Sequence, residues 1–126
     1  MTDFHPRNNL ESALERARSG QISMPDFFHL LAKSDLAVPS VSAVEPDGSG
    51  FQPLLFDKEG AQMIACFTAI ERIGEFAKRA PYCLTVQGNM FLRRIPAGYG
   101  LVLNPGQPSG FDIAPEGVSR IAKEFT

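Results

Sequence analysis

The chain has 126 residues, which is enough for one domain and too few for two ordinary ones. With 44% apolar and 21% charged residues it can build a hydrophobic core, so an intrinsically disordered chain is excluded. The formal net charge of −2 argues against a general nucleic-acid-binding protein, because such proteins need a dense basic face to neutralise phosphates.

Two amphipathic helices are predicted at the start of the chain. Asn8 or Asn9 can cap the first helix, and Glu11 is placed to complete a capping box with Asn8. Gly20 ends this helix, and Ser23 caps the second. Together they form a helical hairpin.

The middle of the chain changes to extended runs and loops. A short strand at 36–38 is expected to stop at Pro39, and the polar stretch 40–50 is the best candidate for a mobile loop. Two further strands follow at 54–56 and 63–67. The second is apolar without alternation, which predicts a central strand covered on both faces.

A helix is predicted to follow the central strand directly. Thr68 and Glu71 have the spacing of a capping box, and Pro81 would close the helix after Arg79. Ile70 and Ile73 would then lie on its buried face.

The last third of the chain alternates short strands with helices. We predict a strand at 82–86, a helix at 88–95, paired strands at 101–103 and 111–113, and a last helix from Pro115 that turns Phe125 inward. The whole chain, residues 1–126, is therefore predicted to be one layered α/β (α+β) domain. It would contain a mixed β-sheet of five to six short strands, packed with four to five helices.

The sequence predicts no metal, no cofactor and no catalytic group. His5 and His29 are far apart, and there is no Cys-x-x-Cys motif. Cys66 and Cys83 are predicted to be buried in the middle of strands, where burial raises a thiol's pKa and makes it inert. We therefore expect a protein that is not an enzyme.

Several features predict where the protein is found. No apolar run approaches the ~20 residues of a membrane span, and the start of the chain lacks the layout of a signal peptide. We therefore expect a cytoplasmic protein that does not bind membranes, with both cysteines reduced.

The candidate binding surface combines a constrained loop with a basic segment. Prolines and glycines pre-shape the loop from Asn104 to Gly110, which includes Gly106, and a rigid loop lowers the entropy cost of binding. Arg93, Arg94 and Tyr99 precede it. The alternative interpretation is that the loop holds two strands in register and the arginines mark the wet side of a helix.

Several motifs, in this order, resemble the N-terminal domain of the SseB family, the enhanced serine sensitivity proteins of bacteria. They are Asn9-Leu10-Glu11, Leu36-Ala37-Val38-Pro39, Ala65-Cys66-Phe67-Thr68, Gly100-Leu101-Val102-Leu103-Asn104-Pro105-Gly106 and Ile113-Ala114-Pro115-Glu116-Gly117-Val118. The resemblance implies a non-enzymatic α/β domain.

The preferred functional prediction is a non-catalytic module that binds an unidentified protein partner. Two rivals are a domain that binds a small molecule related to amino acids and a thiol-dependent enzyme that uses Cys66 or Cys83. A third is a structural homodimer, in which a strand edge pairs with that of a second copy.

Overall fold

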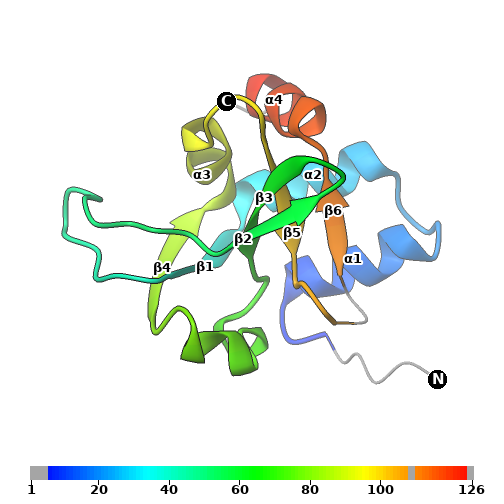
Figure 1. Ribbon diagram of the computed structural model, residues 1–126. Coiled ribbons are helices and arrows are strands. Elements are labelled where there is room, and N and C mark those ends of the chain that lie inside the picture. The colour runs from blue at the N-terminus through cyan, green and yellow to red at the C-terminus, as the bar shows by residue number, and fades with distance from the viewer. Residues whose placement is uncertain (1–5, 108–109, 125–126) are drawn as a thin grey trace.

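The computed structural model describes residues 6–107 and 110–124, which form helices packed against two β-sheets (Figure 1). The α-helices are α1 (Asn9–Arg18), α2 (Met24–Lys33), α3 (Gly88–Arg94) and α4 (Pro115–Glu124), and two 3-10 helices are η1 (Ile70–Arg72) and η2 (Gly74–Lys78). The strands are β1 (Asp35–Ser40), β2 (Leu55–Lys58), β3 (Ala61–Cys66), β4 (Tyr82–Gln87), β5 (Tyr99–Leu103) and β6 (Phe111–Ile113). The predicted α+β class is confirmed. No helix within the described residues is long and apolar enough to span a membrane.

The strands are divided between two sheets. β1 and β4 form an antiparallel pair, while a four-stranded sheet has the order β2-β3-β5-β6, with β3 and β5 parallel. Ala37 of β1 and Phe67, just after β3, exchange backbone hydrogen bonds of 2.9 and 2.8 Å. This bridge joins the two sheets.

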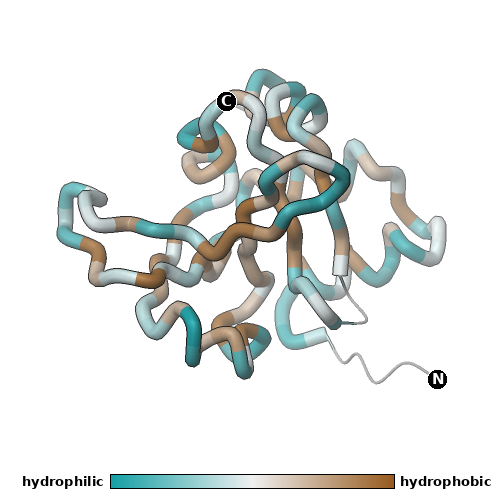
Figure 2. The backbone as a smooth tube through the Cα atoms, in the orientation of Figure 1, coloured by the Kyte–Doolittle hydropathy of each residue, from teal (hydrophilic) through white to brown (hydrophobic). Residues whose placement is uncertain are grey.

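The central strand β3 is covered on both faces, as its uninterrupted apolar run predicts. Ile64 and Cys66 pack in one cluster with core residues of the helices, such as Leu14 and Phe27. On the opposite face, Met63, Ala65 and Phe67 pack with Ile73, beside the 3-10 segment. In Figure 2, much of the hydrophobic colouring lies along β3 and the strands beside it, at the centre of the structure.

The predicted caps of the first two helices are present, but Glu11 behaves differently from the prediction. Asn8 accepts the Glu11 N–H at 2.9 Å, and Ser23 accepts the Asp26 N–H at 3.2 Å. The Glu11 carboxylate does not return to Asn8. It accepts the Arg7 N–H at 2.8 Å, and the carboxylate is buried in the protein interior, where it accepts further hydrogen bonds.

The prediction that β1 stops at Pro39 is wrong, because the strand continues to Ser40. Ala37 points its N–H and C=O towards Phe67 and away from β4. Backbone groups alternate in direction along a strand, so Pro39, two residues later, also points away from β4. A proline at that position removes no hydrogen bond between β1 and β4.

The predicted helix from Thr68 to Arg79 is also wrong in detail. The segment consists of the short turns η1 and η2, and the N-cap of η1 is Ala69, which makes no side-chain cap. The Thr68 hydroxyl is instead bonded to Glu11, and Gly74 has a left-handed φ of 54° that interrupts a regular helix. Consequently Ile70, predicted to be buried, is 57% exposed.

Residues 41–53, named here the arm, project from the body between β1 and β2 (Figure 1). This segment contains most of the predicted mobile loop. Hydrogen bonds cross it, from the Val41 N–H to the Gln52 carbonyl at 2.8 Å and from the Glu45 N–H to the Ser49 carbonyl at 2.9 Å. The arm therefore has a defined hairpin-like path. Phe125, the inward residue predicted at the end of α4, lies outside the described residues.

Candidate functional site

A pocket of about 460 Å³ lies between the arm, β4 and α3. Two of the predicted binding residues, Arg94 and Tyr99, line it together. The rest of its lining is largely apolar and includes Phe51, Leu84, Val86, Phe91 and Ile95. We refer to this feature as the arm pocket. It combines an apolar interior with charged groups.

The position of α3, which supplies one wall of the arm pocket, depends on a glycine. A Cβ atom at Gly88 would lie 2.0 Å from the carbonyl oxygen of Leu31 in α2, so another residue would force the two helices apart. Close packing turns Phe91 and Leu92 inward, where they are 5% and 2% exposed. Arg93 and Arg94 consequently face solvent at the end of the helix.

Arg93 lies beside the arm pocket and does not line it. It borders a smaller hollow of about 260 Å³ together with Met90 and Arg94. The two arginines therefore border one hollow on α3, and Arg94 also lines the arm pocket.

The arm contributes an acidic group to the same pocket. The Asp47 carboxylate accepts the Ser49 N–H at 2.9 Å, and this hydrogen bond lowers the pKa of Asp47. Asp47 therefore remains ionised at neutral pH. The pocket is thus lined by groups of both charges, Asp47 on the arm and Arg94 on α3.

Asn104, another predicted binding residue, lies in the interior. Its side chain is 0% exposed, its Oδ1 accepts the Thr68 N–H at 3.1 Å, and its Nδ2 donates to the Thr68 hydroxyl at 3.0 Å. Its φ of 50° is a conformation that asparagine tolerates better than most residues. Its side chain joins the end of β5 to the end of β3.

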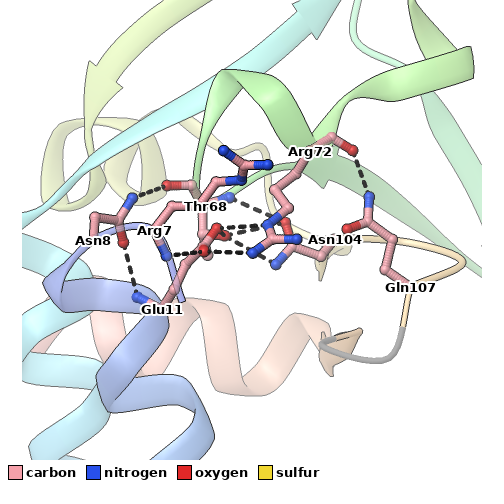
Figure 3. A network of polar contacts seen from close by, with 7 residues as sticks. All are labelled: Arg7, Asn8, Glu11, Thr68, Arg72, Asn104 and Gln107. Carbon is pink, nitrogen blue, oxygen red and sulfur yellow. Dashed lines mark hydrogen bonds and ion pairs between the residues drawn. The ribbon is translucent and has the colours of Figure 1, made fainter. Parts of the chain in front are cut away.

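Asn104 belongs to a buried network that includes an ion pair between Glu11 and Arg72 (Figure 3). Arg72 donates two hydrogen bonds to the Glu11 carboxylate, from Nε at 3.0 Å and from Nη2 at 2.9 Å. The Thr68 hydroxyl donates to the same carboxylate, and Asn8 Nδ2 donates to the Thr68 carbonyl at 2.8 Å. The network joins α1, η1 and the ends of β3 and β5.

The lowered pKa of Glu11 makes the stability of the fold depend on pH. Burial raises the pKa of Glu11, but hydrogen bonds from Arg72, Thr68 and the Arg7 N–H outweigh burial and hold it below its ordinary value of 4.5. A carboxylate with a lowered pKa stabilises the fold above its unfolded pKa and loses that contribution as the pH falls through its folded pKa. We expect the free energy of unfolding, measured with urea, to decrease as the pH falls below about 4.5. This pH-dependent decrease should be absent in Glu11→Gln. An unchanged pH profile in that variant would contradict the assignment.

Sequence reasoning missed this network because each member matched a local pattern. Glu11 and Thr68 were each predicted to complete a capping box, and Asn104 was placed in the predicted binding loop. One signal was available: Glu11 lies three residues before Leu14, on the buried face of α1. A carboxylate on a buried face requires a partner.

Gly106 lies apart from the arm pocket. It is exposed, with a φ of 74°, and the next residue, Gln107, donates its side-chain amide to the Arg72 carbonyl. Tyr99 begins β5 and Asn104 follows its end, so at ~3.3 Å per residue they are about 17 Å apart. The structure therefore brings Arg93, Arg94 and Tyr99 together at one end of β5 and places Asn104 and Gly106 at the other. The rest of the predicted rigid loop includes residues 108–109, which lie outside the described residues.

The two cysteines have different environments. Cys66 is 0% exposed, and burial raises the pKa of its thiol. The prediction that Cys83 is buried is wrong: it is exposed, because its side chain lies with those of Thr85 and Gln87 on the exposed face of β4. Partial burial still raises the pKa of Cys83, and a backbone hydrogen bond from Val38 opposes the rise.

These environments predict slow thiol chemistry. A raised pKa leaves less thiolate at pH 7 than an ordinary cysteine has, and the thiolate is the reactive form. In the native protein, we expect iodoacetamide to label Cys83 more slowly than a free cysteine and to leave Cys66 unmodified. Peptide mapping by mass spectrometry measures both. Rapid labelling of either thiol at neutral pH would contradict this prediction and favour the thiol-dependent enzyme.

Among the residues that the structure describes, no group of three or more His, Cys, Asp or Glu side chains is arranged to hold a metal ion. His29 lies on α2, and His5 lies outside the described residues.

The chain is thus a small α+β domain with two joined sheets, an apolar pocket and a buried ion pair. Residues 10–120 match the family model of the SseB protein N-terminal domain. The chain belongs to the SseB family, which confirms the resemblance seen in its motifs. No match was found among curated proteins or among solved structures.

Proposed function

We propose that this domain is a non-catalytic module that binds a protein partner through the arm pocket. One observation carries the proposal: Arg94 and Tyr99 line the same apolar pocket of about 460 Å³. The partner would insert a large apolar side chain between Phe51 and Phe91, and an adjacent acidic side chain would pair with Arg94.

The chemistry of the arm pocket supports a side-chain anchor. Binding energy at protein interfaces concentrates in a few apolar or aromatic groups that fill pockets, surrounded by a polar rim. Leu84 and Val86 offer apolar surface inside the pocket, while Arg93 and Arg94 form a cationic rim. The rim would steer acidic segments towards the pocket and speed association.

The experiment that tests this function is selection of binding peptides from a random library on the immobilised domain. We expect enriched peptides to share an aromatic or large aliphatic residue next to Asp or Glu. Arg94→Glu should weaken their binding by about tenfold or more, because the charge pair becomes a repulsion. Arg16→Glu, which makes the same charge change on exposed α1, is the matched control and should bind normally. No enrichment, or enrichment that Arg94→Glu does not affect, would overturn the proposal.

A second candidate is a pocket for a small molecule related to amino acids. The observation that favours it is that Asp47 and Arg94 line one pocket, since these charges match the ammonium and carboxylate groups of an amino acid. A pocket of this volume lies within the range of ~300–1,000 Å³ typical of small-molecule sites. A thermal-shift screen with the free amino acids tests it. Stabilisation that disappears in both Asp47→Asn and Arg94→Ala would favour this function over peptide binding.

A further inference from the structure

Strand β4 has a free edge that is ready to form hydrogen bonds. In the described part of the chain it pairs with β1 alone. Because Ala37 bonds to Phe67, its neighbours Leu36 and Val38 are the β1 residues that bond to β4, through Val86 and Leu84. The intervening residues of β4 therefore point their backbone N–H and C=O groups outwards, and their side chains are exposed. They are Cys83, Thr85 and Gln87.

Other sheet edges in the described structure are protected by charge or by length. β2 carries Asp57 and Lys58, and β6 has only the span Phe111–Ile113, in which Asp112 pairs with Lys58. Charges and short length are ways in which proteins prevent an edge from pairing with another chain. β4 has neither: its sequence, Tyr82–Gln87, contains no charged residue and no proline.

We infer that β4 is a dimerisation edge that pairs antiparallel with β4 of a second copy of this chain. A two-fold axis at Thr85 places Thr85 opposite Thr85 of the second copy. Cys83 then lies opposite Gln87, and Leu84 opposite Val86. This register uses every outward-pointing residue of β4, and the two β1–β4 pairs become one continuous four-stranded sheet.

The occupant of this edge is a second copy because the edge is complementary to itself. With no charge in β4, two copies meet without repulsion. Opposed threonines are a favourable cross-strand pair, and each pairing of Leu84 with Val86 extends an apolar surface already formed by partly buried side chains. Thr85 does not line the arm pocket, so failure of this inference leaves the proposed function intact.

Charge placed on the two-fold axis tests the inference. We expect sedimentation velocity of the wild-type chain to show a dimer that forms with increasing concentration. Thr85→Lys and Thr85→Glu should each be monomeric, because like charges lie directly opposite, and an equimolar mixture of the two should recover the dimer. Ser119→Lys, an exposed change on α4, is the control and should still dimerise. A monomeric wild type, or a dimer that survives in Thr85→Lys, would overturn the inference.

A disulfide tests the register directly. Residues opposite each other in a hydrogen-bonded antiparallel pair have Cα atoms ~5.5 Å apart, which suits a disulfide. In a Cys83→Ser background, we expect Thr85→Cys to form a covalent dimer under mild oxidation. Tyr82→Cys in the same background should not, because this register pairs Tyr82 with Gly88 and keeps the two copies of residue 82 apart. Cross-linking through residue 82 but not 85 would show that the register is wrong.

Discussion

Replacing Arg72 with methionine is expected to lower the free energy of unfolding by about 3–5 kcal/mol. Glu11 is 0% exposed, and Arg72 supplies two of the hydrogen bonds that its carboxylate accepts. Removing the cation leaves a charge buried without its partner, and that cost exceeds the worth of the pair itself. Urea unfolding followed by circular dichroism measures the loss.

Two further variants separate the ion pair from a general effect of substitution. Lys78→Met, an exposed change in the same segment, should alter stability by no more than about 0.5 kcal/mol. Glu11→Leu combined with Arg72→Met should recover part of the loss, since both charges are then absent. A loss below about 1 kcal/mol in Arg72→Met would show that the carboxylate finds enough compensation in Thr68 and the Arg7 N–H.

Phe67→Ala should cost a similar amount, about 3–5 kcal/mol, for a different reason. The Phe67 side chain is 0% exposed, and its ring lies 5.9 Å from that of Phe76. Its backbone also forms the bridge to Ala37 that joins the two sheets. Truncation leaves a cavity at this junction.

Hydrogen exchange makes the Phe67 prediction specific to the junction. The amides of Ala37 and residue 67 should lose more protection than amides within α2, because the bridge lies beside the cavity. Val41→Ala, at a side chain that is 43% exposed, is the control and should leave exchange unchanged. Uniform loss across the chain would contradict a local effect.

Local chemistry was sufficient to predict much of the fold. Asn8 and Ser23 cap their helices through residues three positions away, so the pattern contains the whole interaction. The apolar run in β3 likewise predicts burial on both faces without knowledge of the neighbouring strands. Where a few adjacent residues determine the energy, the sequence was informative.

The failures occurred where distant contacts overrode local patterns. Thr68 has the spacing of a cap, but its hydroxyl bonds to Glu11, 57 residues away in the chain. Cys83 is in a strand as predicted, but its exposure depends on which face of β4 the rest of the fold covers, and no local pattern contains that information.

The candidate site was predicted in part for the same reason. Arg94 and Tyr99 lie close together in the chain, and the short connection after α3 keeps them at one pocket. Asn104 follows a strand that carries the chain to the opposite end of the sheet. Its burial arises from hydrogen bonds to Thr68, 36 residues earlier.

The long reach of the buried network has a consequence for the order of folding. Glu11 and Arg72 are 61 residues apart, and Thr68 and Asn104 are 36 residues apart. The entropy cost of closing such long loops must be met before these contacts can form. Proteins dominated by long-range contacts therefore fold slowly. During synthesis, α1 can form early from its own caps, but its carboxylate must wait for Asn104 to leave the ribosome before the network closes. Among the helices described here, α1 is therefore made earliest and is among the last to reach its final place.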